Sequence, residues 1–247
     1  GYELRGCDAL VHGTVPLSSG LSSSAALEAA VATLFEALGD LDIKPVEKAL
    51  LTQAAENNWV GVNCGILDQY SSILGEQHKA LMLDCRSLTH EYANVPRDLR
   101  IVICNTCAPR NLSGSEYGER RSQCEQGAAY FSGIDPSISA LRDVSLELFE
   151  SHETELPPDV AKRSRFVIEE NARVAELADA LDRGDREAIS KIMQASYAGA
   201  RDLFEISVDA MDIMMDSMRS APGVVGCRQA GAGFGGCMVA LVEREQV

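Results

Sequence analysis

One stretch, Pro16-Leu17-Ser18-Ser19-Gly20-Leu21-Ser22-Ser23-Ser24-Ala25-Ala26-Leu27, constrains the fold of this chain more than any other feature. It follows a strand-like run, Cys7–Val15, and precedes a helix-like run, Leu27–Leu38, so the pattern predicts strand, tight loop and helix. Serine is common at helix N-caps, and the N–H groups of a first helical turn lack intrahelical partners. Such a helix start can bind phosphate, and nearby hydroxyls can ligate a metal ion. The same pattern also fits a capped turn that binds nothing.

Length and composition favour a globular protein with one large or two modest domains, since the chain has 247 residues, 46% of them hydrophobic. No apolar run approaches the roughly 20 residues that a membrane-spanning helix needs, and the N-terminus has no signal-peptide pattern. We therefore expect a soluble, cytoplasmic protein with no membrane partner. The first residues read as the middle of a strand, which suggests a piece of a longer chain. The sequence leaves the oligomeric state open.

The eight cysteines lie mostly in apolar or strand-like runs, so we expect reduced, buried thiols. Cys104 and Cys107 have the spacing of a redox or half-zinc motif, but the chain has no second pair at suitable spacing. We expect this pair to mark the end of a strand.

The charge is strongly acidic, with 37 Asp and Glu against 22 Lys and Arg and a formal net charge of −15. Such a chain repels a nucleic-acid backbone, so we expect no nucleic-acid partner. A polyphosphate ligand would be repelled too, and its binding would require a divalent cation and local N–H donors.

Strands and helices come in groups along the chain, which predicts an α+β fold. A boundary near Pro96 would separate a first domain, 1–96, from a mostly helical second domain with a small sheet, 97–247. Besides 27–38, helices are expected over 46–59, 66–74, 116–131, 159–181, 186–204 and 208–219. Besides 7–15, strands are expected over 80–84, 88–93, 100–105, 223–229 and 236–242.

Two carboxylates are candidates for chemistry. Glu56 lies near the end of the second expected helix, where it could hold Mg²⁺, although most helix acids are only exposed. Asp68 follows the glycine-bounded loop 61–65 and opens a short helix. There it could accept a proton from a sugar hydroxyl or simply interact with the helix dipole.

A glycine-rich stretch, Gly231-Ala232-Gly233-Phe234-Gly235-Gly236, fits G-x-G-x-x-G but precedes a β-like run. A dinucleotide-binding fold requires a helix there, so that reading is disfavoured. A glycine loop between two strands lets the backbone approach another segment or a phosphate closely.

Several of these stretches together resemble the galactokinases of the GHMP small-molecule kinase superfamily. The serine stretch is similar to the second GHMP motif, and 231–236 is similar to the third. Three further stretches resemble galactokinase itself: Cys64-Gly65-Ile66-Leu67-Asp68-Gln69-Tyr70, Leu83-Asp84-Cys85-Arg86-Ser87-Leu88 and Gly114-Ser115-Glu116-Tyr117. The resemblance runs essentially from end to end and implies a two-domain GHMP fold, the first domain of the ribosomal S5-like type.

The resemblance implies ATP-dependent phosphorylation of galactose at its anomeric hydroxyl, with ATP and Mg²⁺ as cofactors. Asp68 would face the galactose 1-hydroxyl as base or electrostatic orienter, and Gly65 and Tyr117 would contact the sugar. Ser24, or Ser23, and Glu56 would reach Mg²⁺, and the glycines of 231–236 would support the phosphate loop. Nucleotide binding would fall to Ser19, Gly20, Leu21, Ser22, Ser23, Ser24 and Ala25.

The chain departs from the family pattern in places. Ser18 stands where glycine is commoner, which matters little if its φ is negative, and Ala230 lacks a hydroxyl that the family often has. The family's N-terminal signature, which supplies an arginine beside the catalytic aspartate and several sugar ligands, is missing, as are a final helix and strand. We therefore expect these 247 residues to have little or no kinase activity. Alternatives are a kinase for N-acetylgalactosamine or arabinose, a non-catalytic galactose- and ATP-binding regulator, and a fragment that cannot fold alone.

Overall fold

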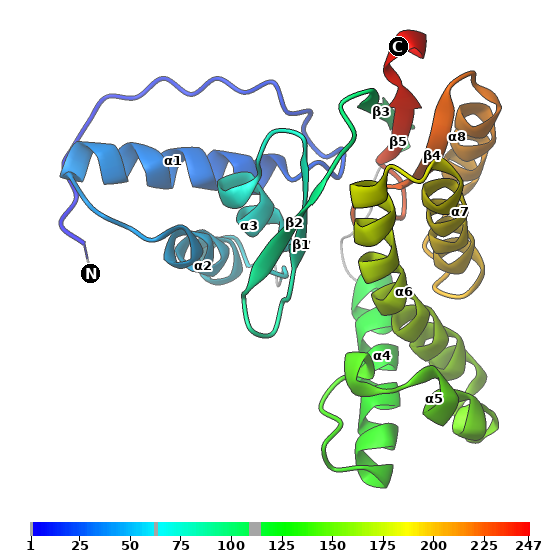
Figure 1. Ribbon diagram of the computed structural model, residues 1–247. Coiled ribbons are helices and arrows are strands. Elements are labelled where there is room, and N and C mark those ends of the chain that lie inside the picture. The colour runs from blue at the N-terminus through cyan, green and yellow to red at the C-terminus, as the bar shows by residue number, and fades with distance from the viewer. Residues whose placement is uncertain (1, 62–63, 109–114) are drawn as a thin grey trace. The chain divides into compact units, whose positions relative to one another are not determined.

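The computed structural model describes residues 2–61, 64–108 and 115–247, and its contacts divide the chain into two compact units, 1–94 and 95–247 (Figure 1). Each unit has its own sheet. In the first, strands β1 and β2 form an antiparallel hairpin. In the second, three antiparallel strands follow the order β3-β5-β4.

The first unit packs helices against its hairpin. Its core contains Ala49, Ile66 and Tyr70, with apolar side chains of β1 beside them. Pro45 occupies the first position of α2, where a missing N–H leaves no helical hydrogen bond unmade. The elements are α1 (Ser23–Gly39), α2 (Pro45–Ala55), the π-helical turn η1 (Glu56–Val60), α3 (Leu67–Leu74), β1 (Lys79–Leu83) and β2 (His90–Asn94).

The strand expected over Cys7–Val15 is wrong. Residues 7–14 have no regular secondary structure, Val15 is a bend, and every residue of this run is exposed. A strand needs a neighbour to accept and donate its backbone hydrogen bonds, and the described residues provide none for this run.

The second unit combines a small sheet with long helices. Pro158 begins α6, and Gly184 ends it in the left-handed conformation at φ 64°. A short helix, α5, was not expected from the sequence. The elements are β3 (Leu99–Asn105), α4 (Ser115–Ile134), α5 (Leu146–His152), α6 (Pro158–Arg183), α7 (Arg186–Asp202), α8 (Asp209–Ser220), β4 (Val224–Gln229) and β5 (Cys237–Glu243).

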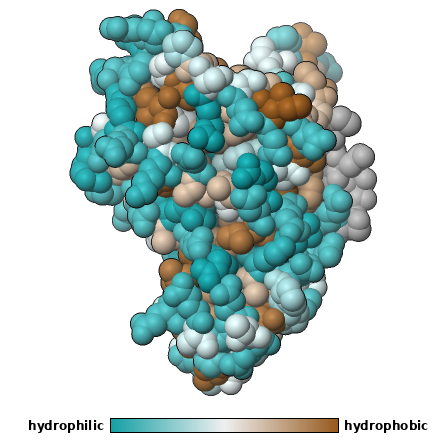
Figure 2. Space-filling view, turned by 90° about the vertical axis from the view of Figure 1, so that its right-hand side faces the viewer, coloured by the Kyte–Doolittle hydropathy of each residue, from teal (hydrophilic) through white to brown (hydrophobic). Residues whose placement is uncertain are grey.

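Several hydrophobic clusters stabilise the second unit, and two of them are large. One joins the sheet to α7 and α8, where methionines of α8 pack against β4 and β5 (Met211, Met215, Met218, Cys227 and Met238). The other joins α4, α5 and α6 around Phe131 and Phe149. The face drawn in Figure 2 is mostly hydrophilic, with apolar side chains in small separate groups, as expected for an acidic, solvated surface.

The α+β class is confirmed, since every strand pairing among the described residues is antiparallel and the helices are grouped. Among those residues, no helix combines the length and the apolar character needed to cross a membrane.

Candidate functional site

The serine loop, residues 16–25, has a backbone that alternates between ordinary and left-handed conformations. Ser18, Gly20 and Ser22 have φ values of 56°, 82° and 57°. Alternating conformations of this kind turn successive N–H groups toward a common concave side, which suits an anion. The positive φ of Ser18 gives a physical reason for the glycine commoner in the family, because a side chain is strained there.

The start of α1 leaves its N–H donors free. Ser22 is the N-cap residue but lies in the left-handed region, and its side chain makes no capping hydrogen bond. The first backbone bond runs from Ala26 N to Ser22 O at 3.0 Å. Within the described chain, the N–H groups of Ser23, Ser24 and Ala25 therefore have no acceptor, and the first turn has no acidic residue. These donors and the helix dipole can receive a phosphate group.

The other loop residues frame these donors. Ser19 is buried and uses its hydroxyl within the loop, donating to Pro16 O at 2.8 Å. Ala25 is fully buried, whereas Leu21, Ser22 and Ser23 are partly exposed. The buried side chain of Ala25 packs the start of α1 against the rest of the first unit, which holds this end of the loop in place.

Glu56 and Ser24, the two residues assigned to the metal, lie in contact. Ser24 Oγ donates to Glu56 Oε1 at 2.9 Å, although 32 positions separate them in the chain. Glu56 is buried, with 8% exposure, and opens the π-helical turn η1 rather than continuing α2 as expected. Such turns often occur at functional sites.

These two oxygens suit Mg²⁺, which prefers hard oxygen ligands in octahedral geometry. Two ligands at its usual distance and at a right angle are about 2.9 Å apart. The donor set therefore fits the cation that an acidic protein needs to bind a polyphosphate.

Two residues that the sequence did not point to complete this cluster. Gln69 Nε2 donates to Glu56 Oε2 at 2.7 Å and to Glu28 Oε2 at 3.2 Å. Burial raises the pKa of Glu28, and repulsion from Glu56 adds to this, while the bond from Gln69 opposes it. Gln69 lies in the galactokinase-like stretch 64–70, which gave it no role, and the Ser24–Glu28 spacing of one helical turn does not distinguish Glu28 from other polar residues.

Asp68 lies in the first turn of α3, next to Gln69 in the chain. Its carboxylate is exposed, and among the described residues it has no hydrogen-bond or ion-pair partner. Gln69 fixes α3 to Glu56, so Asp68 stands one residue from the cluster that contains Ser24. Gly65 precedes it, is exposed, and has no atom within 4 Å of a built Cβ.

Cys64 is held by side chains from the end of α2 and from η1. Asn57 Oδ1 accepts from Cys64 N at 3.1 Å, and Gln53 Nε2 donates to Cys64 O at 3.2 Å. Burial raises the pKa of the Cys64 thiol, with the charge of Glu56 adding to the effect. A raised pKa disfavours the thiolate, so this thiol is a poor candidate for a nucleophile.

Tyr117 belongs to the second unit, where it lies in the first turn of α4 with 43% exposure. Its expected contact with a sugar stays a prediction. Gly114 of the same motif, and positions 62 and 63 of the loop before Asp68, lie outside the described residues.

The glycine loop, residues 231–236, packs against its own unit. Phe234 N donates to Ile206 O at 2.7 Å, and a Cβ on Gly233 would lie 2.5 Å from that oxygen. Thr106 donates to Gly236 O through both its N and its Oγ1. Of the two uses expected for these glycines, the structure shows close approach to another protein segment.

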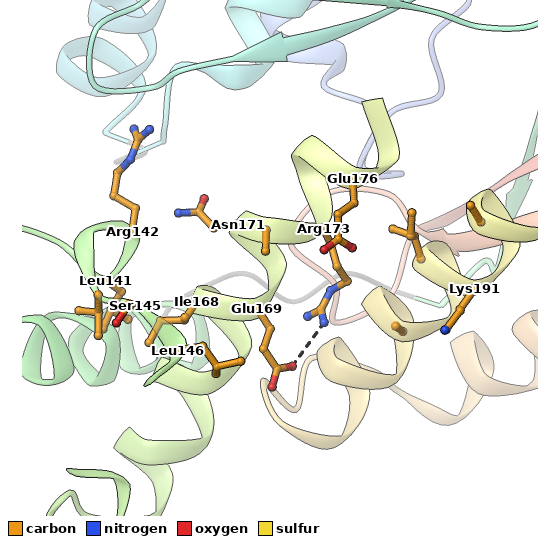
Figure 3. A pocket seen from close by; sticks show the side chains of 15 residues that line it. Leu141, Arg142, Ser145, Leu146, Ile168, Glu169, Asn171, Arg173, Glu176 and Lys191 are labelled. Atoms are coloured by element: carbon orange, nitrogen blue, oxygen red, sulfur yellow. Dashed lines mark hydrogen bonds and ion pairs between the residues drawn. The ribbon is translucent and has the colours of Figure 1, made fainter. Parts of the chain in front are cut away.

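A groove of about 730 Å³ lies between α6, α7 and residues 141–146 (Figure 3). Its charged side chains are of both signs, and the Arg173 guanidinium pairs with Glu169 at 3.3 Å within it. None of the site residues expected from the sequence lines it. The mixed charges favour no particular class of ligand.

Two family models match the chain. The model described as GHMP kinases N terminal domain matches residues 1–76, and the one described as GHMP kinases C terminal matches residues 177–247. Together they account for more than half of the chain.

Solved structures agree with these matches. A galactokinase from Lactococcus lactis, crystallised with galactose, is 36% identical with a TM-score of 0.88 over 94% of this chain. The chain spans 60% of that protein's length. Mevalonate kinase of L. major, in complex with R-mevalonate, is 16% identical, with a TM-score of 0.56 over 90% of this chain and 56% of its own. Phosphomevalonate kinase of Streptococcus pneumoniae, with phosphomevalonate and AMPPNP, is 14% identical, with a TM-score of 0.55 over 87% and 59%. The last two share the fold alone.

Proposed function

The chain belongs to the GHMP kinases, and on that premise we propose that the complete protein carrying it phosphorylates galactose at the anomeric hydroxyl, using ATP. The observation that supports this most is the uncapped start of α1 beside the Ser24–Glu56 contact. Free N–H donors and a pair of hard oxygen ligands stand together there, as a magnesium-bound nucleotide requires.

In this proposal, the backbone N–H groups of Gly20 to Ala25 hold the terminal phosphates of the nucleotide. Ser24 and Glu56 would hold Mg²⁺, which neutralises charge on the phosphate oxygens when bound. The tight loop and the packed Ala25 keep these donors in place before the substrate arrives. Such prior positioning is the main contribution that a protein makes to phosphoryl transfer.

Asp68 would accept the proton of the sugar O1 as that oxygen forms its bond to the γ-phosphorus, and the bond to ADP breaks. Its carboxylate is exposed and unpartnered among the described residues, so it is available to a substrate. The galactose assignment is supported by the 36% identity to a galactokinase crystallised with galactose. Gly65 and Tyr117 are proposed to contact the sugar.

The test is a coupled ADP-release assay on the complete protein, with galactose, N-acetylgalactosamine and arabinose offered separately, followed by identification of the product. We expect galactose 1-phosphate. Asp68→Asn should lower kcat by about 10²–10⁴-fold while nucleotide binding persists. If only another of these sugars is phosphorylated, the galactose assignment is wrong. An Asp68→Asn variant with full activity would contradict the mechanism.

A further inference from the structure

Gln69 is the fully buried member of the cluster around Glu56. Its amide nitrogen donates to carboxylates from two different elements, Glu56 of η1 and Glu28 of α1. Since a carboxylate only accepts hydrogen bonds, the amide nitrogen, and not its oxygen, must face both groups.

This orientation of the Gln69 amide leaves its oxygen without a hydrogen bond in the described chain. The other end of the amide, Gln69 Oε1, is buried and has no hydrogen-bond partner among the described residues. An unsatisfied buried acceptor is unfavourable and calls for an explanation. The hydrogen bonds from Gln69 Nε2 to Glu28 and Glu56 supply that explanation, because they hold together two carboxylates whose negative charges would otherwise repel each other.

The geometry also fixes which carboxylate oxygen of Glu56 faces Ser24 and could ligate a cation with it. Oε2 is occupied by Gln69 at 2.7 Å, and Oε1 is left facing Ser24 Oγ at 2.9 Å. Without the amide, repulsion from Glu28 would act on a Glu56 side chain held only at Oε1, by Ser24. Residues that hold metal ligands in this way commonly matter for metal affinity nearly as much as the ligands.

We propose that Gln69 is a positioning residue for the cation site: by bridging Glu28 and Glu56, it holds Glu56 Oε1 against Ser24, ready for a divalent cation. This inference rests on the proposed function, because it assigns Ser24 and Glu56 to the cation. Gln69 itself touches neither the nucleotide nor the sugar in this role.

The test measures Mn²⁺ binding to the complete protein with AMPPNP, by the electron paramagnetic resonance signal of free Mn²⁺. Gln69→Met removes the donor and keeps the shape of the side chain, and we expect it to weaken Mn²⁺ binding by about 10–100-fold. In the kinase assay, the KM for Mg²⁺ should rise by more than kcat falls.

Tyr70→Phe is the matched control. Tyr70 is the next residue of α3, is equally buried, and donates to Leu88 O at 2.7 Å, away from the carboxylates. Removing the Tyr70 hydroxyl perturbs the packing of the same helix. Tyr70→Phe should therefore lower thermal stability and leave Mn²⁺ affinity unchanged.

A rescue variant separates positioning from packing. Glu28→Gln, added to Gln69→Met, removes the repelling charge and supplies a new amide beside Glu56. We expect the double variant to recover most of the lost Mn²⁺ affinity. If Gln69→Met fails to fold, Gln69→Asn takes its place with the same expected loss, because it keeps a polar side chain but draws the amide back from both carboxylates by one methylene.

The outcomes are distinguishable. If Glu56→Gln leaves Mn²⁺ affinity unchanged, the cation site of the proposed function is overturned, and this inference with it. If Glu56→Gln weakens binding but Gln69→Met does not, only the inference is overturned. A loss in Gln69→Met that Glu28→Gln fails to relieve also counts against positioning.

Discussion

The serine loop and the glycine loop are built from the same unusual backbone and use it in opposite ways. Both contain several residues at positive φ, Ser18, Gly20 and Ser22 in one and Gly231 to Gly236, apart from Ala232, in the other. The glycine loop directs N–H and C=O groups to Ile206 and Thr106 of its own unit. The serine loop leaves the N–H groups of Ser23, Ser24 and Ala25 without acceptors in the described chain. Free donors, rather than left-handed residues, therefore distinguish a candidate phosphate site from a packing device.

Of the substitutions that test this difference between the two loops, Gly233→Ala should change stability most. The new Cβ would lie 2.5 Å from Ile206 O, at φ 81°, so both overlap and backbone strain oppose it. We expect a loss of about 2–4 kcal/mol. The melting temperature of the second unit should fall by about 5–15 °C in calorimetry.

Gly133→Ala is the control for that change, because it adds a methyl group in open space at the end of α4. It should leave the second unit unchanged or stabilise it by up to about 1 kcal/mol. If Gly233→Ala melts like Gly133→Ala, the glycine loop is not packed against Ile206.

A smaller effect is expected on the stability of the second unit at acidic pH. Segment 203–206, on which the glycine loop rests, is tied to α6 by Arg163, which donates to Glu205 Oε2 at 2.7 Å. Hydrogen bonds from Arg163, and next from Lys162, lower the pKa of Glu205 from 4.5 to about 2. The ionised form is thus favoured in the folded state, and its contribution is full above pH 4.5 and lost as the pH falls toward 2.

Glu205→Gln should therefore reduce the drop in urea midpoint of the second unit between pH 5 and pH 3. Solvent screens this pair, since the Glu205 side chain is 41% exposed, so the change should be modest. An exposed glutamate on α6 of the same unit, replaced as Glu176→Gln, is the control. An acid dependence that Glu205→Gln leaves intact would contradict the assignment.

The smallest effect is expected in the serine loop. Ser18 is exposed and strained at φ 56°, so Ser18→Gly should stabilise the first unit by a few tenths to about 1 kcal/mol. Ser122→Gly, an exposed helical position in α4, should destabilise its unit by about 0.5 kcal/mol. Urea unfolding measures both, and a destabilising Ser18→Gly would show that the hydroxyl side chain is needed there.

The sequence was most informative where local signals act alone. Pro45 and Gly75 bound α2 and α3 close to the expected positions, and Gly184 ends α6. The run over 7–15 has strand propensity, but a strand also needs a partner, which propensity cannot supply. Helix α5, seven residues long, carries too few residues for its period to be read.

The site was predictable in part for the same reason. The serine loop can be recognised from its residue types. The turn η1, which sets the position of Glu56, has no distinct sequence pattern. The contact of Ser24 with Glu56 spans 32 positions. The residues alone made Glu56 and the serine hydroxyls separate candidates for a metal, and the family resemblance paired Ser24 with Glu56. Gln69 was missed because its role depends on which carboxylates the fold brings to it.

The most direct test of the account is a crystal structure of the complete protein with AMPPNP and Mg²⁺. We predict the terminal phosphates on the N–H groups of residues 20–25, with the cation bound by Ser24 and Glu56. Phosphates bound elsewhere, with the start of α1 open to solvent in a nucleotide-loaded crystal, would contradict it.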